Sequence, residues 1–306
     1  MRLTASSDER AIVVGQLRAA AGNCGLDARD LIRHRGLYFR VSVIGSCNLN
    51  CVFCHNEGGE KTGKLSFETA ETAFSAAAAV GFERIQFTGG EPLTHVGLTT
   101  FVEIGRRHFS DVGVTTNGTL LMKRLPALAD SGVNRIHLSL QRETLMDDTG
   151  AWRVPSWLIS AIQKCEESAI FLRINLPVAL PDISVAQSFL RDTCGMPFSL
   201  KVFALLADQD TAYQHYINQL REIVDVANSD RVNFSGHSVL LRDHMHPNGS
   251  RCASCTARPV CTESSRSLRL GVDGVLRPCL ATRYWDFPLR ADFAYDDLEA
   301  AALLAL

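Results

Sequence analysis

Short apolar runs alternate along the chain with longer segments whose apolar residues recur every three or four positions. The short runs are rich in β-branched and aromatic residues and predict strands at 37–44, 84–87, 112–116, 135–140, 171–176 and 199–204. The periodic segments predict helices at 67–80, 96–108, 120–130, 157–168 and 184–191. Such repetition of strand and helix predicts a parallel sheet with right-handed crossovers, and therefore an α/β fold.

Local signals mark the ends of several elements. Ser66 is placed to cap the helix that starts at residue 67, and Gly81 is placed to stop it. Two further helices are expected at about 9–21 and 27–35, where we find no candidate chemistry. Asp273-Gly274 predicts the turn of a hairpin formed by residues 268–272 and 275–278.

The segment after about residue 208 differs from the rest. Beyond an expected helix near 213–227 it becomes irregular and polar. It holds His237, His244 and His246, which could be metal ligands. Because their spacing fits no regular ligand pattern, surface-loop positions are favoured.

Length and charge limit the class of protein. The 306 residues give room for one large α/β domain and a small appendage. The net charge of −2 provides no basic field for nucleic acid. No apolar run approaches the length of a membrane span, and the first ten residues are too polar for a signal peptide. We therefore expect a cytoplasmic protein with no nucleic-acid or membrane partner.

Three cysteines, Cys47, Cys51 and Cys54, lie within eight residues directly after the first predicted strand. Thiolates at this spacing can ligate three irons of a [4Fe–4S] cluster and leave the fourth iron open. Zinc with His55 as a fourth ligand, a disulfide framework and plain buried thiols are the alternatives. Clustering of thiols in a reduced compartment favours a metal or cluster site.

A second group of cysteines follows near the end of the chain. Cys252 and Cys255 form a Cys-x2-Cys pair, with Cys261 and Cys279 downstream. Four such residues are typical of a metal site, and the ligands alone do not separate a zinc ribbon from an iron–sulfur cluster. The other three cysteines stand alone and are expected to be buried small apolar residues; they are Cys24, Cys165 and Cys194.

Four motifs in order resemble the radical S-adenosylmethionine (SAM) superfamily. The first is Cys-x3-Cys-x-aromatic-Cys, with Phe53 as the aromatic residue. The segments at 84–92, which ends Gly-Gly-Glu-Pro, at 114–118 and at 135–140 resemble the ends of the family's second, third and fourth strands. The resemblance implies a partial (β/α)6 barrel at 37–207, after an N-terminal helical extension at 1–36.

The same resemblance implies the residues that bind SAM. The Gly-Gly turn would bring backbone close to the methionyl amino group, because glycine has no side chain to block it. Hydroxyl and amide groups at the later strand ends would contact the ribose or the carboxylate. The implied cofactor-binding residues are Gly89, Gly90, Glu91, Pro92, Thr116, Asn117, Ser139 and Asn175. The implied reaction is reductive cleavage of SAM to methionine and a 5′-deoxyadenosyl radical, which abstracts a hydrogen atom from the substrate.

The C-terminal cysteines resemble the auxiliary-cluster domains called SPASM and twitch. Cys261, Gly274 and Cys279 follow the Cys-x12-Gly-x4-Cys spacing of such domains. The resemblance implies a small domain at 208–306 with one auxiliary [4Fe–4S] cluster, and therefore two [4Fe–4S] clusters in the protein.

Within the superfamily, residues 38–280 resemble the GTP cyclases of molybdenum-cofactor biosynthesis. Several positions depart from that family. Ser264 or Ser265 stands where a middle cluster cysteine is expected, and Gln86 and His95 stand where basic residues are expected. A triphosphate needs several converging cations, so these departures favour another substrate.

The leading hypothesis is therefore a radical SAM enzyme acting on a small, natural-product-like molecule, with the auxiliary cluster aiding oxidation or substrate binding. The GTP cyclase itself, a peptide-modifying enzyme and a non-enzymatic metal-stabilised module are the alternatives. Flavodoxin or ferredoxin is the expected electron donor, and no general acid or base can be named. The candidate substrate contacts are Arg40, Gln86, His137, Gln141, Arg142, Arg266 and Arg269.

Overall fold

The computed structural model describes residues 5–23, 25–51, 54, 61–145, 153–178, 183–204, 231–234, 237–241, 267–279 and 283–305. Its contacts divide the chain into two units, the first made of Met1–Val114 with His244–Leu306 and the second of Thr115–Asp243. The expected domain boundaries near residues 36 and 207 stay predictions.

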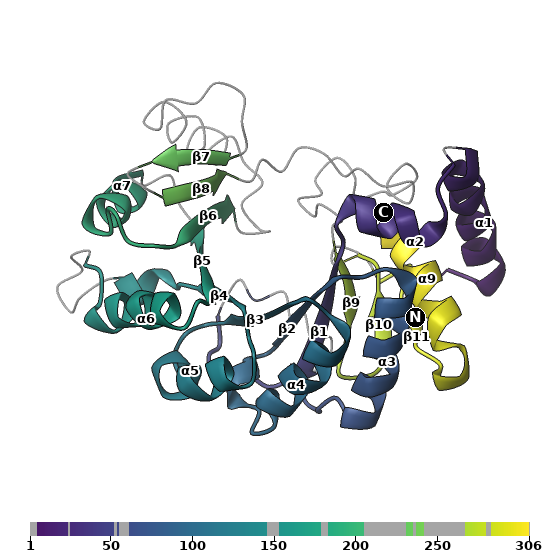
Figure 1. Cartoon of the computed structure of the whole chain (residues 1–306), viewed down its shortest axis with the longest axis horizontal. Helices are drawn as coiled ribbons and strands as arrows, with labels where there is room; N and C mark the ends of the chain where they lie inside the picture. The colour runs from purple at the N-terminus through teal and green to yellow at the C-terminus, as the bar shows by residue number, and fades with distance from the viewer. Residues whose placement is uncertain are drawn as a thin grey trace. The chain divides into compact units, whose positions relative to one another are not determined.

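The first unit is built on parallel strands (Figure 1). β1 (Tyr38–Ile44) pairs in parallel with β2 (Arg84–Gly89) on one side and with β9 (Ser267–Leu270) on the other. β2 pairs in parallel with β3 (Asp111–Thr116), within which the division between the units falls. The predicted α/β fold with a parallel sheet is confirmed.

The predicted C-terminal hairpin is present and extends this sheet. β10 (Val275–Arg277) runs antiparallel to β9, and β11 (Phe287–Pro288) runs antiparallel to β10. Because β9 also pairs with β1, residues from the two ends of the chain share one sheet. The short β11 follows no alternating pattern in the sequence and was not predicted.

Two helices cover one face of β1 and β2 (Figure 1). α3 (Phe67–Val80) begins at Ser66, whose hydroxyl accepts from the Thr69 amide at 3.0 Å, and ends at Gly81 in the left-handed conformation. Both ends were predicted. α4 (Leu98–His108) packs beside α3.

Apolar side chains of α3, α4 and the sheet form the core of this unit. The rings of Phe39, Phe74, Phe87 and Phe101 are fully buried and stack in a chain of tilted and edge-to-face contacts. Burial of four phenylalanine side chains contributes on the order of 10 kcal/mol. The apolar core therefore occupies the face of the sheet that α3 and α4 cover, and polar residues lie on the opposite face.

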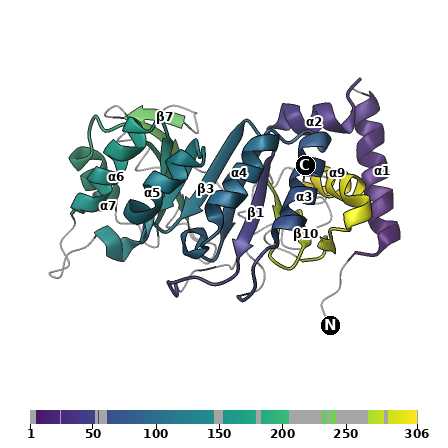
Figure 2. The same ribbon diagram turned by 60° about the horizontal axis from the view of Figure 1, so that its bottom comes forward.

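Three helices from the ends of the chain pack together beside α3 (Figure 2). α1 (Ser7–Asn23) and α2 (Ala28–Arg35) occur where they were predicted, and α2 contacts α3. α9 (Ala294–Ala305) was not predicted. It contacts α1, α2 and α3, and its residues 301–305 are completely buried.

The second unit is also built on parallel strands. β4 (Arg135–Ser139), β5 (Phe171–Val178), β6 (Ser199–Ala204) and β8 (His237–Leu241) are parallel neighbours in that order. The predicted helices are also present, as α5 (Leu121–Asp130), α6 (Ser156–Glu167) and α7 (Ile183–Asp192). Apart from β8, which was not predicted, the boundaries of these elements lie within two residues of the predicted ones.

One prediction in this unit was wrong. The segment expected to be irregular forms β7 (Arg231–Phe234), which turns back antiparallel onto β8. His237, expected in a surface loop, is the first residue of β8. Three consecutive apolar residues, Val239 to Leu241, with Val232 opposite Val239, favour strands here, because β-branched and apolar residues are enriched in strands.

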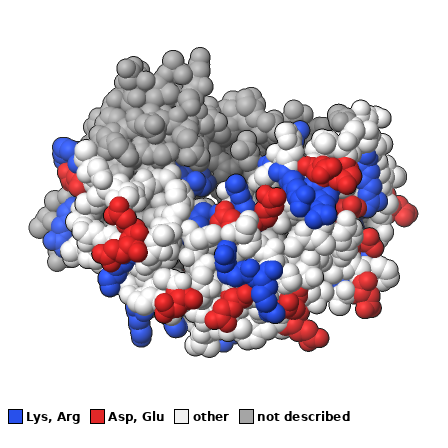
Figure 3. Space-filling model, in the orientation of Figure 1, with Lys and Arg blue, Asp and Glu red and all other residues white. Residues whose placement is uncertain are grey.

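Charge on the surface is mixed. Basic and acidic side chains are interspersed over the described residues on the face shown in Figure 3, in keeping with the net charge of −2. In the part of the chain that the structure describes, no helix combines the length and the apolar character needed to cross a bilayer.

Candidate functional site

The cysteine loop follows β1 in the first unit. Among the described residues none of its three thiols is in a disulfide; Cys47 and Cys54 are exposed and Cys51 is half-buried. The amide of Cys54 donates to the Cys51 carbonyl at 3.1 Å, and the amide of Leu49 donates to the Cys47 sulfur at 3.4 Å. Both bonds lie within the loop and hold the backbone around its cysteines.

The chemical type of the ligands in this loop suits an iron–sulfur cluster. Three accessible, unbridged thiols on one loop are what such a cluster requires. Among the described residues, no three thiol, imidazole or carboxylate groups already converge on a common point. Phe53 and His55 lie outside the described residues, so the zinc alternative with His55 is not tested.

The two ends of the cysteine loop are tied to each other. Ile44 and Lys64 form an antiparallel bridge, and the Gly45 amide donates to the Gly63 carbonyl at 3.0 Å. The Leu65 amide donates to the Val43 carbonyl at 3.1 Å. The loop therefore leaves β1 and returns at the same place.

The Gly-Gly turn after β2 holds the start of this loop. The Gly90 amide donates to the Ile44 carbonyl at 2.8 Å, and the Glu91 amide donates to the Ser46 carbonyl at 3.0 Å. Glu91 is buried, and its carboxylate accepts from the Leu93 amide at 3.0 Å. Pro92, also buried, starts the short helix η1 (Pro92–Thr94). The expected contact of these residues with SAM stays a prediction.

Polar residues form a row on the face of the first sheet opposite α3 and α4. The register places Arg40 beside Gln86 on one side and beside Arg269 on the other. Gln86 and Arg269 are buried and Arg40 is half-buried. Three predicted substrate contacts are thus neighbours in one row.

Two predicted cofactor residues of the second unit, Thr116 and Asn117, lie at the end of β3. Buried Thr116 accepts from the Gly118 amide at 3.0 Å. Asn117 accepts from the amide and the hydroxyl of Thr119, which shapes the turn after β3. Thr116 and Asn117 therefore stabilise the turn, whatever else they bind.

Ser139 ends β4 and is the register neighbour of Asn175, which lies within β5 and not at its end as expected. The Asn175 amide donates to the Ser139 hydroxyl at 3.5 Å. The side-chain carbonyl oxygens of Asn175 and nearby Gln141 are buried and accept no hydrogen bond from the described residues. Buried acceptors of this kind suit a ligand that donates hydrogen bonds.

Two cations that were not predicted lie on the same face of these strands as Asn175. Arg173 on β5 lies beside His137 on β4, and Lys201 on β6 lies beside Asn175. Both cations are half-buried, whereas the alternate residues Leu172 and Ile174 are buried. The period-two alternation of polar and apolar residues in β5 and β6 was the available signal.

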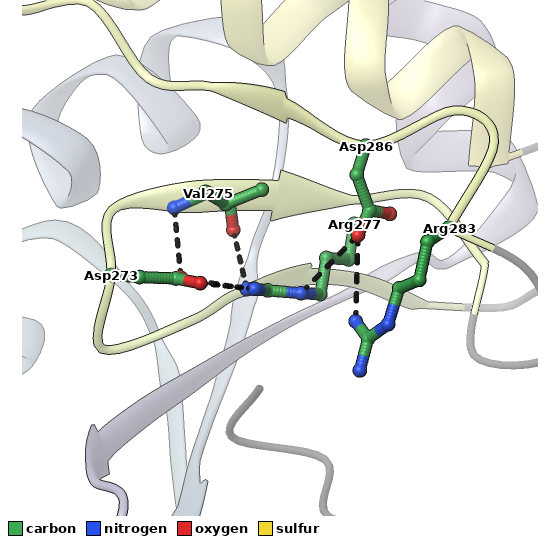
Figure 4. A network of polar contacts seen from close by, with 5 residues as sticks. All are labelled: Asp273, Val275, Arg277, Arg283 and Asp286. Atoms are coloured by element: carbon green, nitrogen blue, oxygen red, sulfur yellow. Dashed lines mark hydrogen bonds and ion pairs between the residues drawn. The ribbon is translucent and has the colours of Figure 1, made fainter. Parts of the chain in front are cut away.

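The C-terminal hairpin holds a charged network (Figure 4). The buried guanidinium of Arg277 makes a two-pronged contact with Asp273, with one nitrogen at 2.9 Å, and donates to the Val275 carbonyl at 3.1 Å. Its Nε lies 3.4 Å from the carboxylate of Asp286, which Arg283 approaches at 3.5 Å. The network pins the strand that leads to Cys279.

The two carboxylates of this network titrate differently. The hydrogen bond and charge of Arg277 outweigh burial and lower the pKa of Asp273. Burial raises the pKa of Asp286 to about 6, because its two arginine contacts are long and do not offset the loss of solvent.

The remaining cysteine predictions have mixed outcomes. Cys279 is buried beside the network, whereas Cys252, Cys255, Cys261 and Arg266 lie outside the described residues, as does Cys24. Cys165 is buried as predicted, and burial raises its pKa to about 11. The prediction for Cys194 was wrong, because the turn after α7 leaves it exposed.

The other described residues among the predicted substrate contacts belong to the second unit. His137 is buried on β4 and Gln141 is half-buried just beyond it. Arg142 starts η2 (Arg142–Leu145), and its side chain is not described. Arg40, Gln86 and Arg269 belong to the first unit, and His137 and Gln141 belong to the second.

Comparison with known protein sequences identifies relatives. Residues 41–143 match the family model of the Radical SAM superfamily. A protein named GTP 3′,8-cyclase from Pelotomaculum thermopropionicum is 36% identical over 154 residues, which span 44% of this chain and 47% of the relative. Another of that name, from Heliobacterium modesticaldum, is 28% identical over 274 residues, which cover 80% of this chain and 81% of the relative. The chain thus spans about half the length of the first relative.

Solved structures share the fold. The structure of SuiB from Streptococcus suis bound to the precursor peptide SuiA superposes with a TM-score of 0.62 over 95% of this chain and 70% of that chain, at 15% identity. The matched region, 41–143, contains the end of β1, the cysteine loop and the Gly-Gly turn. The chain therefore carries a radical SAM domain.

Proposed function

We propose that this enzyme acts on an anionic small molecule, and that GTP or a related purine nucleotide is the first candidate. The observation that carries the proposal is that each unit, taken by itself, presents a pair of cations on adjacent strands. Arg40 and Arg269 are register neighbours in the first unit, and Arg173 and Lys201 lie on adjacent strands of the second. Each charge-assisted hydrogen bond to a phosphate contributes about 1.5–3 kcal/mol.

Relatives support the same candidate. Proteins named GTP 3′,8-cyclase align with about four-fifths of this chain. The neutral Gln86 and the position of His95, where basic residues are expected in that family, favour another substrate. Arg173 and Lys201 restore positive charge. The GTP alternative therefore ranks first.

The residues would divide the work as follows. Cys47, Cys51 and Cys54 would hold a [4Fe–4S] cluster, and Gly89 to Pro92 with Asn117 would hold SAM. When bound, these cofactors supply the 5′-deoxyadenosyl radical that abstracts a hydrogen atom from the substrate. The chain itself would orient the substrate through its cations and exclude water.

A second cluster belongs to the same proposal. Cys252, Cys255, Cys261 and Cys279 would ligate an auxiliary [4Fe–4S] cluster beside the charged network. A cellular flavodoxin or ferredoxin would supply electrons. Iron and sulfide content of the reconstituted protein tests the number of clusters directly.

Product analysis tests the substrate. Anaerobic, reconstituted protein with SAM and a reductant is incubated with and without GTP, and products are identified by mass spectrometry and NMR. The proposal expects a product in which positions 3′ and 8 of GTP are joined, with 5′-deoxyadenosine above its level without GTP. Equal 5′-deoxyadenosine in both samples, from protein that carries its clusters, contradicts GTP as the substrate.

Charge variants test the binding face. Arg173→Met is expected to raise the KM for the anionic substrate about 10- to 100-fold, the loss of one charge-assisted contact. Arg191→Met, at an exposed arginine on α7, is the matched control and should leave the KM unchanged. An unchanged KM in Arg173→Met would remove the main support for an anionic substrate.

One observation favours a second candidate. The neutral amide of Gln86 is completely buried in the row that also holds Arg40 and Arg269. A neutral group there suits a substrate with fewer anionic groups than a triphosphate, such as a carboxylated or monophosphorylated natural-product intermediate. Formation of 5′-deoxyadenosine without conversion of GTP is the result that points to this candidate.

A further inference from the structure

We infer that the turn Gly89-Gly90-Glu91 is a clamp that positions Cys47, in addition to any contact it makes with SAM. The inference rests on the proposed role of the cysteine loop. Two consecutive amides of this turn donate to the backbone directly before the first cysteine, at 2.8 Å to Ile44 and at 3.0 Å to Ser46. The clamp therefore acts one residue away from a proposed cluster ligand.

Steric space explains why residue 90 is glycine. A Cβ atom at position 90 would lie 2.0 Å from the Ser46 carbonyl oxygen and 2.7 Å from that of Gly45. The φ angle of Gly90 is not positive, so its backbone conformation is open to any residue. Among the described residues, it is the close approach of the cysteine loop that requires glycine at this position.

Glycine is required at position 89 for two reasons. Its φ angle of +144° lies in a region that favours glycine, and an added Cβ would also lie 2.2 Å from the Ile44 carbonyl oxygen. A substitution there would combine backbone strain with a clash. Gly90 is therefore the cleaner site for a test.

The clamp acts on a loop that is already closed. The Ile44–Lys64 bridge and the bond from Gly45 to Gly63 fix where the loop leaves and returns. Hydrogen bonds to the turn then fix the direction in which the chain enters the loop. Ordering the base of the loop in advance lowers the conformational entropy that ligation must remove, so the ligand set binds its cluster more tightly.

The Gly90→Ala variant tests the clamp. Its methyl group must displace the Ser46 carbonyl and with it Cys47. We expect the rate of cluster loss to a ferrous chelator to rise about tenfold or more, as when a group that supports a metal ligand is removed. Iron content and visible absorption are followed under anaerobic conditions, with no turnover required.

Gly105→Ala is the matched control. It makes the same change in α4, where the added Cβ would lie 3.3 Å from the ring of Phe87, on the helical face of β2. It perturbs packing of the same strand without touching the cysteine loop. We expect its cluster to be lost at the wild-type rate, and circular dichroism to show that both variants are folded.

Each result is decisive. A folded Gly90→Ala variant that keeps its cluster as long as the wild type overturns the clamp. Wild-type protein that never binds a cluster contradicts the proposed function instead, which separates the two failures. If Gly90→Ala does not fold, hydrogen exchange of the wild-type protein decides, because the clamp requires slow exchange in a peptide that spans Gly90 and Glu91. Exchange at unprotected rates there overturns the inference.

Discussion

Two regions of the first unit lead to a proposed cluster ligand, and they are held in different ways. The backbone before Cys47 is fixed by main-chain hydrogen bonds to the Gly-Gly turn. Because Gly90 has no side chain, the two segments can approach closely. The strand before Cys279 is fixed by the Arg277 guanidinium between two carboxylates. Main-chain bonds do not titrate, whereas the charged network depends on the protonation of Asp286. We therefore expect the stability of the first region to be independent of pH and the stability of the second region to depend on pH.

The largest effect is expected from Arg277→Met. Removing the guanidinium leaves Asp273 and Asp286 partly buried without their main partner. Breaking a buried ion pair from one side costs about 3–5 kcal/mol of unfolding free energy. Chemical denaturation measures the loss, and Arg283→Ala, at a more exposed partner of Asp286, should cost less than about 1 kcal/mol. Equal losses in the two variants would contradict the central role of Arg277.

Next in size is Gly271→Ala, the counterpart of Gly90→Ala. An added Cβ would lie 1.9 Å from a guanidinium nitrogen of Arg277, which would have to leave Asp273. We expect a loss of about 2–3 kcal/mol in unfolding free energy, the value of a charged hydrogen bond. In an Arg277→Met background the same change should cost little. Additive losses in this double-mutant cycle would show that the glycine serves another purpose.

Asp286→Asn tests the predicted pH dependence. The folded pKa of Asp286, about 6, lies above its ordinary value of 3.8, so the neutral carboxyl stabilises the fold fully below pH 3.8 and this contribution is lost as the pH rises through 6. Asparagine stays neutral. The unfolding free energy of the Asp286→Asn variant, minus that of the wild type, should therefore rise by about 2 kcal/mol between pH 4 and pH 7. Denaturation at several pH values measures the difference, and a constant difference would mean that Asp286 does not titrate in this range.

The smallest effect is expected at the returning arm of the cysteine loop. Ser66→Ala removes the cap of α3 and should cost about 1 kcal/mol of unfolding free energy, equally at pH 5 and pH 8. Ser66→Asp keeps a capping oxygen and should retain most of the stability. A pH-dependent loss in Ser66→Ala would contradict the contrast between the two regions.

Local chemistry decided what the sequence could predict. The cap at Ser66, the stop at Gly81 and the turn at Asp273-Gly274 depend on residues within four positions of one another, and all three are present. The parallel strands followed from apolar patterning because burial of one face is a property of each strand alone.

Long-range pairing decided what it could not predict. The partner of β9 is β1, far away along the chain, and nothing within either strand specifies it. The buried helix α9 and the pairing of β8 with β6 were missed for the same reason. At the site, the need for glycine at position 90 arises from the Ser46 carbonyl, which no pattern near residue 90 reveals.

The first unit is discontinuous in the chain, with Thr115–Asp243 inserted between its two parts. Arg18 and Glu299, which form an ion pair across the helices of this unit, are 281 positions apart. Contacts so distant raise the contact order, and proteins of high contact order fold slowly. A fragment ending near residue 114 would lack β9 and expose the edge of β1, a template for aggregation. The first unit is therefore expected to remain an incomplete folding intermediate until its C-terminal strands dock.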